Sequence, residues 1–448
     1  MSSFKSAATK TAQRSWRRSA CRCFSYFLLV LVAGCQSNIT NRARESASNI
    51  TANISNLPSV VLPSVFPSTA RIDSDFSIPN ATILPNGDHA VITTFYSTNR
   101  TFSNSIASNG MFGQRRANAA TFGKSYSVLP RSGSNFEIES ETLLKVQINE
   151  PTENTRALKH VIIQDRAEFS SEITTRMRLT EEKRAMLYVH DFNVSFEKAA
   201  NNAAKLAYDL GFSGTTFFFS WPARGDAPAY VADLEDAMRS TESLRSMIRD
   251  IILLTPTEQL LIVGEGMGAL IASNALQSTI TLNPEYQNFL KEIIFIAPDI
   301  ENSSFTNVLA KLVASANIYI TLYVSENYSN VESNEFFGEI QTPSTRNNQA
   351  HTENVGEALL HKLVGATENG VSEDFKIEII DMNRSNTRLA EAEGFADSSA
   401  ILRDLWNLVH YGNRANFRNT LTPCLSAGGT FWTINPEDLR SISQGCRR

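Results

Sequence analysis

The feature that most constrains the fold lies after residue 181, where short apolar runs alternate with amphipathic stretches of helical period. Apolar runs of about four to eight residues, rich in β-branched and aromatic side chains, predict strands that are buried on both faces. Strands that alternate with helices form a mostly parallel sheet covered by helices on both faces, so we expect an α/β fold. The predicted strands cover residues 185–190, 215–221, 259–264, 292–297, 318–324 and 375–381.

Helices are predicted between these strands. In the first, apolar residues from Phe196 to Leu210 recur at helical spacing, and Gly211 ends the segment. Two more helices are predicted over residues 267–277 and 397–410. Three further strands are predicted upstream of residue 181, at residues 90–96, 143–149 and 160–165.

A glycine-rich turn follows the predicted strand at residues 259–264. Its sequence, Gly264-Glu265-Gly266-Met267-Gly268, runs directly into a predicted helix. This is the strand–turn–helix context of a nucleophile elbow, G-x-S-x-G. The central position is Gly266, which has no side chain and cannot act as a nucleophile. No GxGxxG motif follows the first of these strands, which argues against a Rossmann-type domain.

Three longer strings make a resemblance specific. They are HDFNVSF (190–196), AAKLAYDLGF (203–212) and FSWPARG (219–225). They resemble the strings HGFNVSF, AYDLGF and FSWPS-R-G of a bacterial α/β-hydrolase family labelled DUF900, which is often described as esterase- or lipase-like. The resemblance extends over residues 90–410. It implies an α/β-hydrolase-like fold with extra N-terminal strands.

The same resemblance locates the catalytic triad positions and finds other residues there. The family's serine falls on Gly266, its acid on Tyr328 and its histidine on Ala392. No histidine lies between His361 and His410, so a shift of the alignment by a few residues does not restore one. The resemblance therefore implies a hydrolase fold without a serine, acid or histidine at the triad positions.

The oxyanion-binding positions are altered as well. In this fold one donor is the N–H group after the nucleophile, here Met267, and the other comes from the loop of Asp191 and Phe192. Asp191 stands where the family has glycine. A carboxylate there, with Glu265 at the elbow, would oppose a developing oxyanion by several kcal/mol at separations of about 4–6 Å and an effective dielectric near 20.

Other polar residues near the strand ends leave two alternatives open. Ser195, Ser220 and His190 could support hydrolysis, but we expect Ser195 to begin a helix, Ser220 to pack beneath its neighbours and His190 to hold its loop by hydrogen bonds.

The second alternative is a cation site. Asp191, Glu265 and Asp299 could meet at one sheet edge and bind a cation, although solvated or capping acids are commoner. We expect neither a metal nor a cofactor.

The N-terminal 34 residues indicate export. A basic stretch ends at Arg22, and the apolar run at 24–34 is too short to span a bilayer but matches the core of a signal peptide. Val32-Ala33-Gly34-Cys35 resembles a bacterial lipobox, which implies cleavage before Cys35 and lipidation of its thiol. By family rule, Gln36 suggests sorting to the outer membrane. The alternative is an uncleaved anchor with an incidental cysteine.

The rest of the chain divides by composition. Residues 35–85 are rich in Ser, Asn, Thr and Pro and predict a flexible tether, followed by a hydrolase-like domain at 86–420 and a C-terminal tail at 421–448. Cys424 and Cys446 are expected to form a disulfide, because exported proteins are normally oxidised and a metal site needs more ligands than this pair.

Charge excludes one class of partner. The whole chain carries a net charge of −5, and loss of the predicted signal with its six basic residues leaves 35 basic against 46 acidic, or −11. Such a surface repels nucleic acid.

We therefore predict a lipoprotein of the bacterial cell envelope, anchored in the lipid bilayer through Cys35 and facing the periplasm. Its domain is predicted to bind an unknown protein or small molecule, or to act as a scaffold, without catalysis. The alternative function is an active esterase or lipase that uses unconventional residues.

Overall fold

The computed structural model describes residues 81–83, 89–102, 111–130, 157–180, 182–224, 230–300, 318–324, 376–382, 399–426 and 429–434. Twelve strands in these ranges form one sheet. They are β1 (Ala81–Ile83), β2 (His89–Phe102), β3 (Phe112–Pro130), β4 (Ala157–Gln164), β5 (Arg184–Val189), β6 (Thr215–Ser220), β7 (Gln259–Glu265), β8 (Leu290–Ile296), β9 (Tyr319–Val324), β10 (Ile377–Asp381), β11 (Leu421–Ser426) and β12 (Gly429–Ile434).

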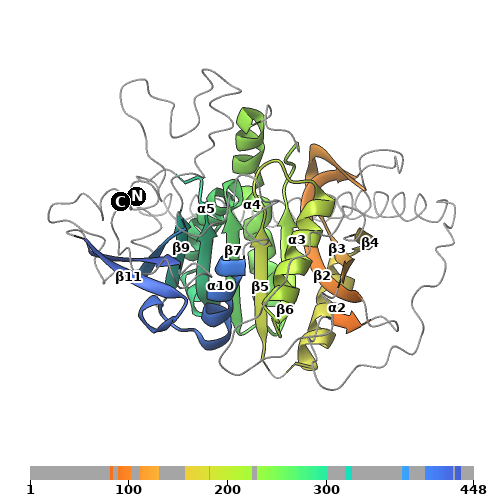
Figure 1. Cartoon of the computed structure of the whole chain (residues 1–448). Coiled ribbons are helices and arrows are strands. Elements are labelled where there is room, and N and C mark those ends of the chain that lie inside the picture. The colour runs from red at the N-terminus through yellow and green to blue at the C-terminus, as the bar shows by residue number, and fades with distance from the viewer. Residues whose placement is uncertain are drawn as a thin grey trace, which may run out of the picture. The chain divides into compact units, whose positions relative to one another are not determined.

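The sheet is mixed, with a long parallel centre (Figure 1). Its order is β11-β12-β10-β9-β8-β7-β5-β6-β2-β3-β4, and β1 pairs with β2. All strands from β12 to β2 along this path run parallel. The pairings of β1, β3, β4 and β11 are antiparallel. The predicted parallel sheet is thus confirmed, with antiparallel strands at both edges.

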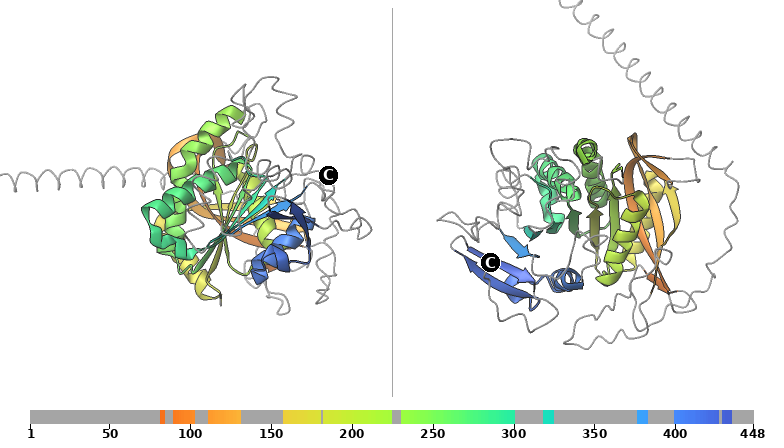
Figure 2. Two further views of the ribbon diagram at one scale, coloured as in Figure 1. Left: turned by 90° about the vertical axis from the view of Figure 1, so that its left-hand side faces the viewer. Right: turned by 45° about the horizontal axis from the view of Figure 1, so that its top comes forward.

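Helices cover both faces of the sheet, as the two turned views show (Figure 2). One face packs against α2, α4 and α5, and the other against α3 and α10. No helix within the described ranges is long and apolar enough to cross a membrane. The bounds are α2 (Arg166–Arg178), α3 (Phe196–Asp209), α4 (Tyr230–Leu254), α5 (Met267–Leu282) and α10 (Ser399–Tyr411), with short 3-10 helices η2 (Pro284–Phe289) and η7 (Ala415–Phe417).

The core is built by central strands whose side chains are buried on both faces. In β5, Leu187 and Val189 pack toward α4 and α5, and Met186 and Tyr188 pack toward α3. This explains why the sequence shows continuous apolar runs and no alternation with polar residues. The aromatic run Phe217–Phe219 of β6 is fully buried in the same way.

Helix α3 begins and ends where the sequence predicted. Ser195 is the N-cap, and its side-chain oxygen accepts a hydrogen bond of 3.1 Å from the N–H of Lys198. Gly211 follows the helix with φ of 55°, a backbone conformation that favours glycine. The predicted inward face, from Phe196 to Leu210, is buried.

The longest elements that were not predicted are β3, α2 and α4. The second half of β3 buries Gly123, Ser125 and Ser127, which are small residues without an apolar signal. A side chain on Gly123 would lie 2.0 Å from the backbone oxygen of Ile162, so glycine permits the close strand approach. The strand predicted at 143–149 lies outside the described residues.

Two predicted domain boundaries need correction. Residues 81–83 form β1, so the tether expected to reach residue 85 ends earlier. The tail expected from residue 421 instead contributes β11 and β12, and β12 pairs with β10 through Ile380 and Trp432. The two short strands were not predicted because their hydrogen bonds depend on pairing: β11 pairs with β12, and β12 also pairs with β10.

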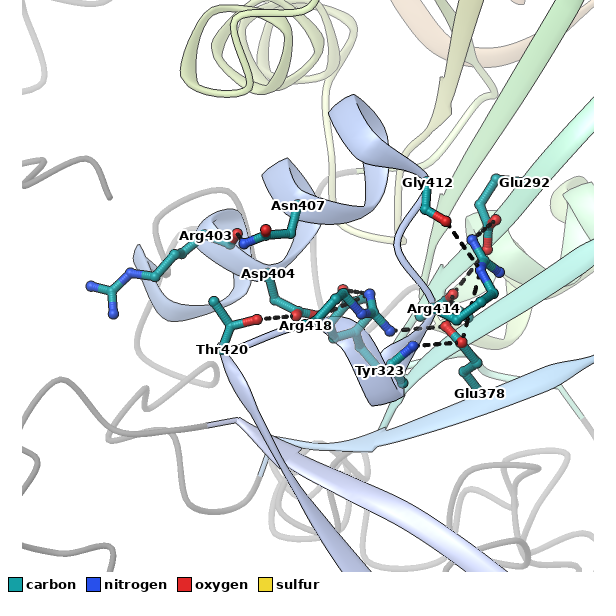
Figure 3. A network of polar contacts seen from close by, with 12 residues as sticks. Glu292, Tyr323, Glu378, Arg403, Asp404, Asn407, Gly412, Arg414, Arg418 and Thr420 are labelled. Carbon is teal, nitrogen blue, oxygen red and sulfur yellow. Dashed lines mark hydrogen bonds and ion pairs between the residues drawn. The ribbon is translucent and has the colours of Figure 1, made fainter. Parts of the chain in front are cut away.

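A buried polar network holds this C-terminal part against the sheet (Figure 3). Arg418 is fully buried and lies 2.9 Å from Glu378 of β10 and 3.1 Å from Asp404 of α10. Tyr323 of β9 donates a hydrogen bond of 2.6 Å to Asp404. Arg414 binds Glu292 of β8 at 2.7 Å. Three strands and one helix are thus joined through the side chains on either side of η7.

Candidate functional site

The predicted elbow is present at the carboxyl end of β7. Gly266 lies between β7 and α5 with φ of 50° and ψ of −118°, outside the regions that residues with side chains normally occupy. Its N–H donates to the backbone oxygen of Ile296 at 3.0 Å. Gly268 packs so closely on the end of β5 that a side chain would lie 2.2 Å from the backbone oxygen of Val189. The glycines therefore produce the tight strand-to-helix turn that the motif predicted.

The space next to Gly266 is filled by Asp191. A Cβ atom added at Gly266 would lie 1.9 Å from Oδ1 of Asp191 and 2.1 Å from its Cγ, well inside van der Waals contact. Asp191 follows β5, the neighbour of β7 in the sheet, and its side chain is buried. The Asp191 carboxyl group thus occupies the position where an elbow nucleophile would have its side chain.

The same carboxyl group binds both predicted oxyanion donors. Oδ1 of Asp191 accepts a hydrogen bond of 2.7 Å from the N–H of Met267 and another of 2.7 Å from the N–H of Phe192. The structure therefore brings Asp191, Phe192 and Met267 together, as the sequence implied. The expected role of Asp191 was to repel an oxyanion bound nearby. In the structure, its carboxyl oxygen instead accepts the two hydrogen bonds that an oxyanion would accept.

Two more acids lie near the elbow, and each is bound by a tyrosine. Tyr188 of β5 donates a hydrogen bond of 2.7 Å to Glu265, and Tyr230 of α4 donates to Asp299. Burial raises the pKa of Asp191 well above its usual value, and the charge of Glu265 raises it further. Burial also raises the pKa of Asp299. Among the described residues, no group of three or more His, Cys, Asp or Glu is arranged to hold a metal ion.

A chain of hydrogen bonds fixes the loop that carries Asp191. Nδ1 of His190 lies 2.6 Å from the backbone oxygen of Asp191, so Nδ1 donates and Nε2 is left to accept. Nε2 lies 3.3 Å from the hydroxyl of Ser220, which accepts a hydrogen bond of 2.9 Å from Nε of Arg100. The indole of Trp221 donates to the backbone oxygen of His190 at 2.8 Å and stacks on its ring. His190 therefore holds its loop by hydrogen bonds, as predicted, and Ser220 is buried between Arg100 and His190.

Arg100 is a site residue that the sequence did not reveal. It lies on β2, is 1% exposed, and donates to the backbone oxygens of Val194 at 2.6 Å and Ala223 at 3.0 Å. These contacts tie the loops after β5 and β6 to β2. Arg100 comes a few residues after the strand predicted at 90–96, and nothing in the sequence pattern shows which distant loops it reaches.

Several predicted positions lie outside the described residues. These are Cys35, the family-equivalent triad positions Tyr328 and Ala392, and Cys446. Cys424, at the β11–β12 pair, is buried and disulfide-bonded. Its bond to Cys446 stays a prediction.

Comparison with known proteins supports the fold. Residues 165–339 match the family model described as an α/β hydrolase of unknown function, DUF900. No curated protein matches the chain.

Three of the similar solved structures are hydrolases or hydrolase-related proteins. A structure from Lactobacillus plantarum WCFS1 described as a cell surface hydrolase is 12% identical, with 52% of this chain and 94% of that chain covered and a TM-score of 0.32. A lipase-esterase related protein from Clostridium acetobutylicum ATCC 824 is 8% identical, with 33% and 76% covered and a TM-score of 0.21. Trichoderma reesei cutinase is 12% identical, with 30% and 63% covered and a TM-score of 0.20. The match to this family model over residues 165–339 and the mostly parallel sheet covered by helices together show that this chain has an α/β-hydrolase fold.

Proposed function

We propose that this protein is a membrane-anchored lipoprotein whose α/β-hydrolase fold serves binding or scaffolding and does not catalyse hydrolysis. One observation carries the proposal: the elbow position is Gly266, and the Asp191 carboxyl group fills the adjacent space while accepting both N–H groups that would stabilise an oxyanion.

The chemistry of acyl transfer explains why this arrangement opposes catalysis. A serine hydrolase needs a nucleophile, a base in contact with it and an acid that orients the base, and these act as a unit. Gly266 provides no nucleophile. The family-equivalent positions of the acid and base, Tyr328 and Ala392, provide neither function. A substrate oxyanion would have to displace Asp191 from both donors, and removal of one such donor from an active enzyme already costs roughly 10²–10³-fold in rate.

The alternative, an esterase with unconventional residues, finds little support at the two serines considered. The side-chain oxygen of Ser195 caps α3 by accepting a hydrogen bond from the N–H of Lys198. Ser220 is fully buried between Arg100 and His190. His190 is also fully buried, and burial, with the charge of Arg100 second, lowers its pKa to about 3, so it is a poor general base at neutral pH.

Hydrolysis of short p-nitrophenyl esters by the purified chain tests this proposal. We expect no turnover above a heat-treated control and no fluorophosphonate labelling at the elbow. Gly266→Ser alone should also stay inactive, because the new hydroxyl would lack a base and would collide with Asp191. Turnover by the wild type that is lost on substitution of Ser195, Ser220 or His190 would establish the esterase alternative.

The envelope location is part of the proposal and is supported by the lipobox-like sequence Val32-Ala33-Gly34-Cys35. We expect the mature chain to begin at an acylated Cys35, to partition with membranes and to sort to the outer membrane. Its ligand would be a protein or small molecule of the periplasm. Mass spectrometry that finds Met1 retained, or a Cys35→Ser chain that still partitions with membranes, would contradict the lipid anchor.

A further inference from the structure

The N–H groups of Phe192 and Met267 form a cradle that points at a single acceptor atom. Both lie 2.7 Å from Oδ1 of Asp191, a short distance for an N–H to oxygen hydrogen bond. Met267 is the first residue of α5, a helix of 16 residues, so the helix dipole adds to the attraction for a negatively charged oxygen. The N–H of Met267 is buried and that of Phe192 is partly buried, so both would destabilise the fold if they had no acceptor, and the cradle therefore requires an occupant.

Asp191 fits the cradle only because position 266 is glycine. Any Cβ atom at Gly266 would lie within 2.3 Å of three atoms of the carboxyl group. A side chain at the elbow and a carboxyl group in the cradle therefore exclude each other. The absence of a nucleophile and the presence of Asp191 are two aspects of one packing arrangement.

The carboxyl group stays in the cradle despite unfavourable electrostatics. Asp191 is 6% exposed, and the charges of Glu265 and Asp299 both disfavour its ionised form. The two N–H bonds act in the opposite direction. Nδ1 of the buried His190 ring donates a hydrogen bond of 2.6 Å to the backbone oxygen of Asp191. This bond fixes the loop, and with it the orientation of the Asp191 side chain. A carboxyl group in this position is thus a built-in feature of the fold.

We propose that this cradle is a carboxylate-binding site for which Asp191 is the built-in ligand, and that a free small carboxylate such as formate takes the same place once the Asp191 side chain is removed. The proposal concerns the same site as the proposed function but does not need the protein to be inactive. It makes Asp191 the residue that keeps the oxyanion cradle both folded and closed.

Chemical rescue of stability tests the site directly. Asp191→Ala in the full chain should lower the Tm, and formate should raise it again by about 2 °C or more at a concentration near ten times its Kd. Formate should leave the wild type unchanged, because its cradle is filled. Asp191→Asn should show a smaller loss and no rescue, because the amide oxygen still accepts the two N–H groups. Formamide, which is neutral, and sodium chloride serve as solute controls.

Asp299→Ala is the matched variant, because it removes another acid beside the elbow that does not bind the cradle. Its Tm should not respond to formate beyond the effect of sodium chloride. If Asp191→Ala does not fold, Asp191→Gly purified with formate replaces it, and dialysis against chloride should then lower its Tm. The proposal would be overturned if Asp191→Ala and Asp299→Ala responded equally to formate. It would also be overturned if formate had no effect on the Tm of Asp191→Ala or, where that variant does not fold, of Asp191→Gly.

A double-variant comparison tests the packing step without any ligand. Gly266→Ala should lower the Tm strongly in the wild type, where the new Cβ collides with Asp191. It should lower the Tm less in an Asp191→Gly background, where only the strain of the positive φ remains. Additive losses would show that Asp191 does not fill the space at Gly266. Neither stability experiment depends on hydrolysis, so ester turnover by the wild type would end the proposed function and leave these results intact.

Discussion

Among single residues, His190 shows how the interior supports the elbow. Its Nδ1 donates to the backbone oxygen of Asp191, and its Nε2 accepts from Ser220, which in turn accepts from Arg100. Each position in this chain has a donor facing an acceptor, provided that the imidazole is neutral. A proton on Nε2 would remove the acceptor for the Ser220 hydroxyl and place a second positive charge in a buried site near Arg100. The arrangement therefore depends on a histidine that does not ionise.

This dependence predicts a pH effect on stability. Burial first, and the Arg100 charge second, lower the pKa of His190 from 6.5 to about 3. Below pH 6.5 the unfolded chain gains a proton that the folded chain excludes, so this contribution to stability is complete above pH 6.5. The free energy of unfolding then falls by about 1.4 kcal/mol for each pH unit as the pH decreases from 6.5 toward 3.

The comparison that isolates this effect uses His190→Gln, which cannot titrate. Urea unfolding of both proteins between pH 6.5 and 4.5 should show a steeper loss of unfolding free energy in the wild type. Carboxyl groups titrate in both proteins, so only the difference between the slopes is informative. Parallel slopes would mean that His190 ionises normally in the fold.

At the scale of elements, α10 and the hairpin β11–β12 are attached to the sheet by buried charges as well as by apolar contacts. Arg418 stands between two carboxylates from different elements, Asp404 and Glu378, and Tyr323 also binds Asp404. Buried ion pairs of this kind contribute little net stability relative to apolar packing, but removal of one partner leaves a charge unpaired in the interior.

Arg418→Met should therefore destabilise the protein by about 3–5 kcal/mol, because Asp404 and Glu378 would lose their buried cation. Chemical denaturation measures the loss. Arg245→Met is the matched control, since Arg245 pairs with the exposed Glu242 on the surface of α4, and its removal should cost no more than about 1 kcal/mol. Similar losses for the two variants would mean that the Arg418 network does not hold α10 in place.

At the scale of the whole molecule, the sheet continues on both sides of the segment that matches the family. Strands β2 to β4 precede residue 165, and β10 to β12 follow residue 339. Both additions reach the interior: Arg100 of β2 supports the elbow loops, and Cys424 and Phe431 of the hairpin pack in the core. The folding unit is therefore longer than the matched segment.

Two truncations test how far the unit extends. A stop after residue 420 removes β11 and β12, whereas a stop after residue 434 keeps both, and each variant lacks Cys446. The shorter chain should be less stable by more than about 4 kcal/mol, because it loses the burial of Phe431, Ile434 and Leu421 and exposes the edge of β10. Thermal unfolding of the two chains measures the difference. Equal Tm values would place the end of the folding unit at residue 420, as the sequence first suggested.

Local patterns in the sequence were enough to predict the parallel sheet, the helix from Phe196 to Gly211 and the turn around Gly266. These predictions hold because burial on a strand or helix repeats at a fixed period, and because a tight turn restricts which residues can occupy it. The placement of Asp191, Phe192 and Met267 at one site came instead from the resemblance to the hydrolase family.

Only the tertiary structure showed that the Asp191 carboxyl group enters the cradle, that Arg100 reaches the neighbouring loops and that residues 421–434 complete the sheet. Each of these depends on side-chain direction or strand pairing between segments far apart in the chain: 76 residues separate Asp191 from Met267, and 122 separate Thr98 on β2 from Ser220. Periodicity reports whether a residue is buried, but not which distant group it meets, because that is decided by the packing of the whole sheet.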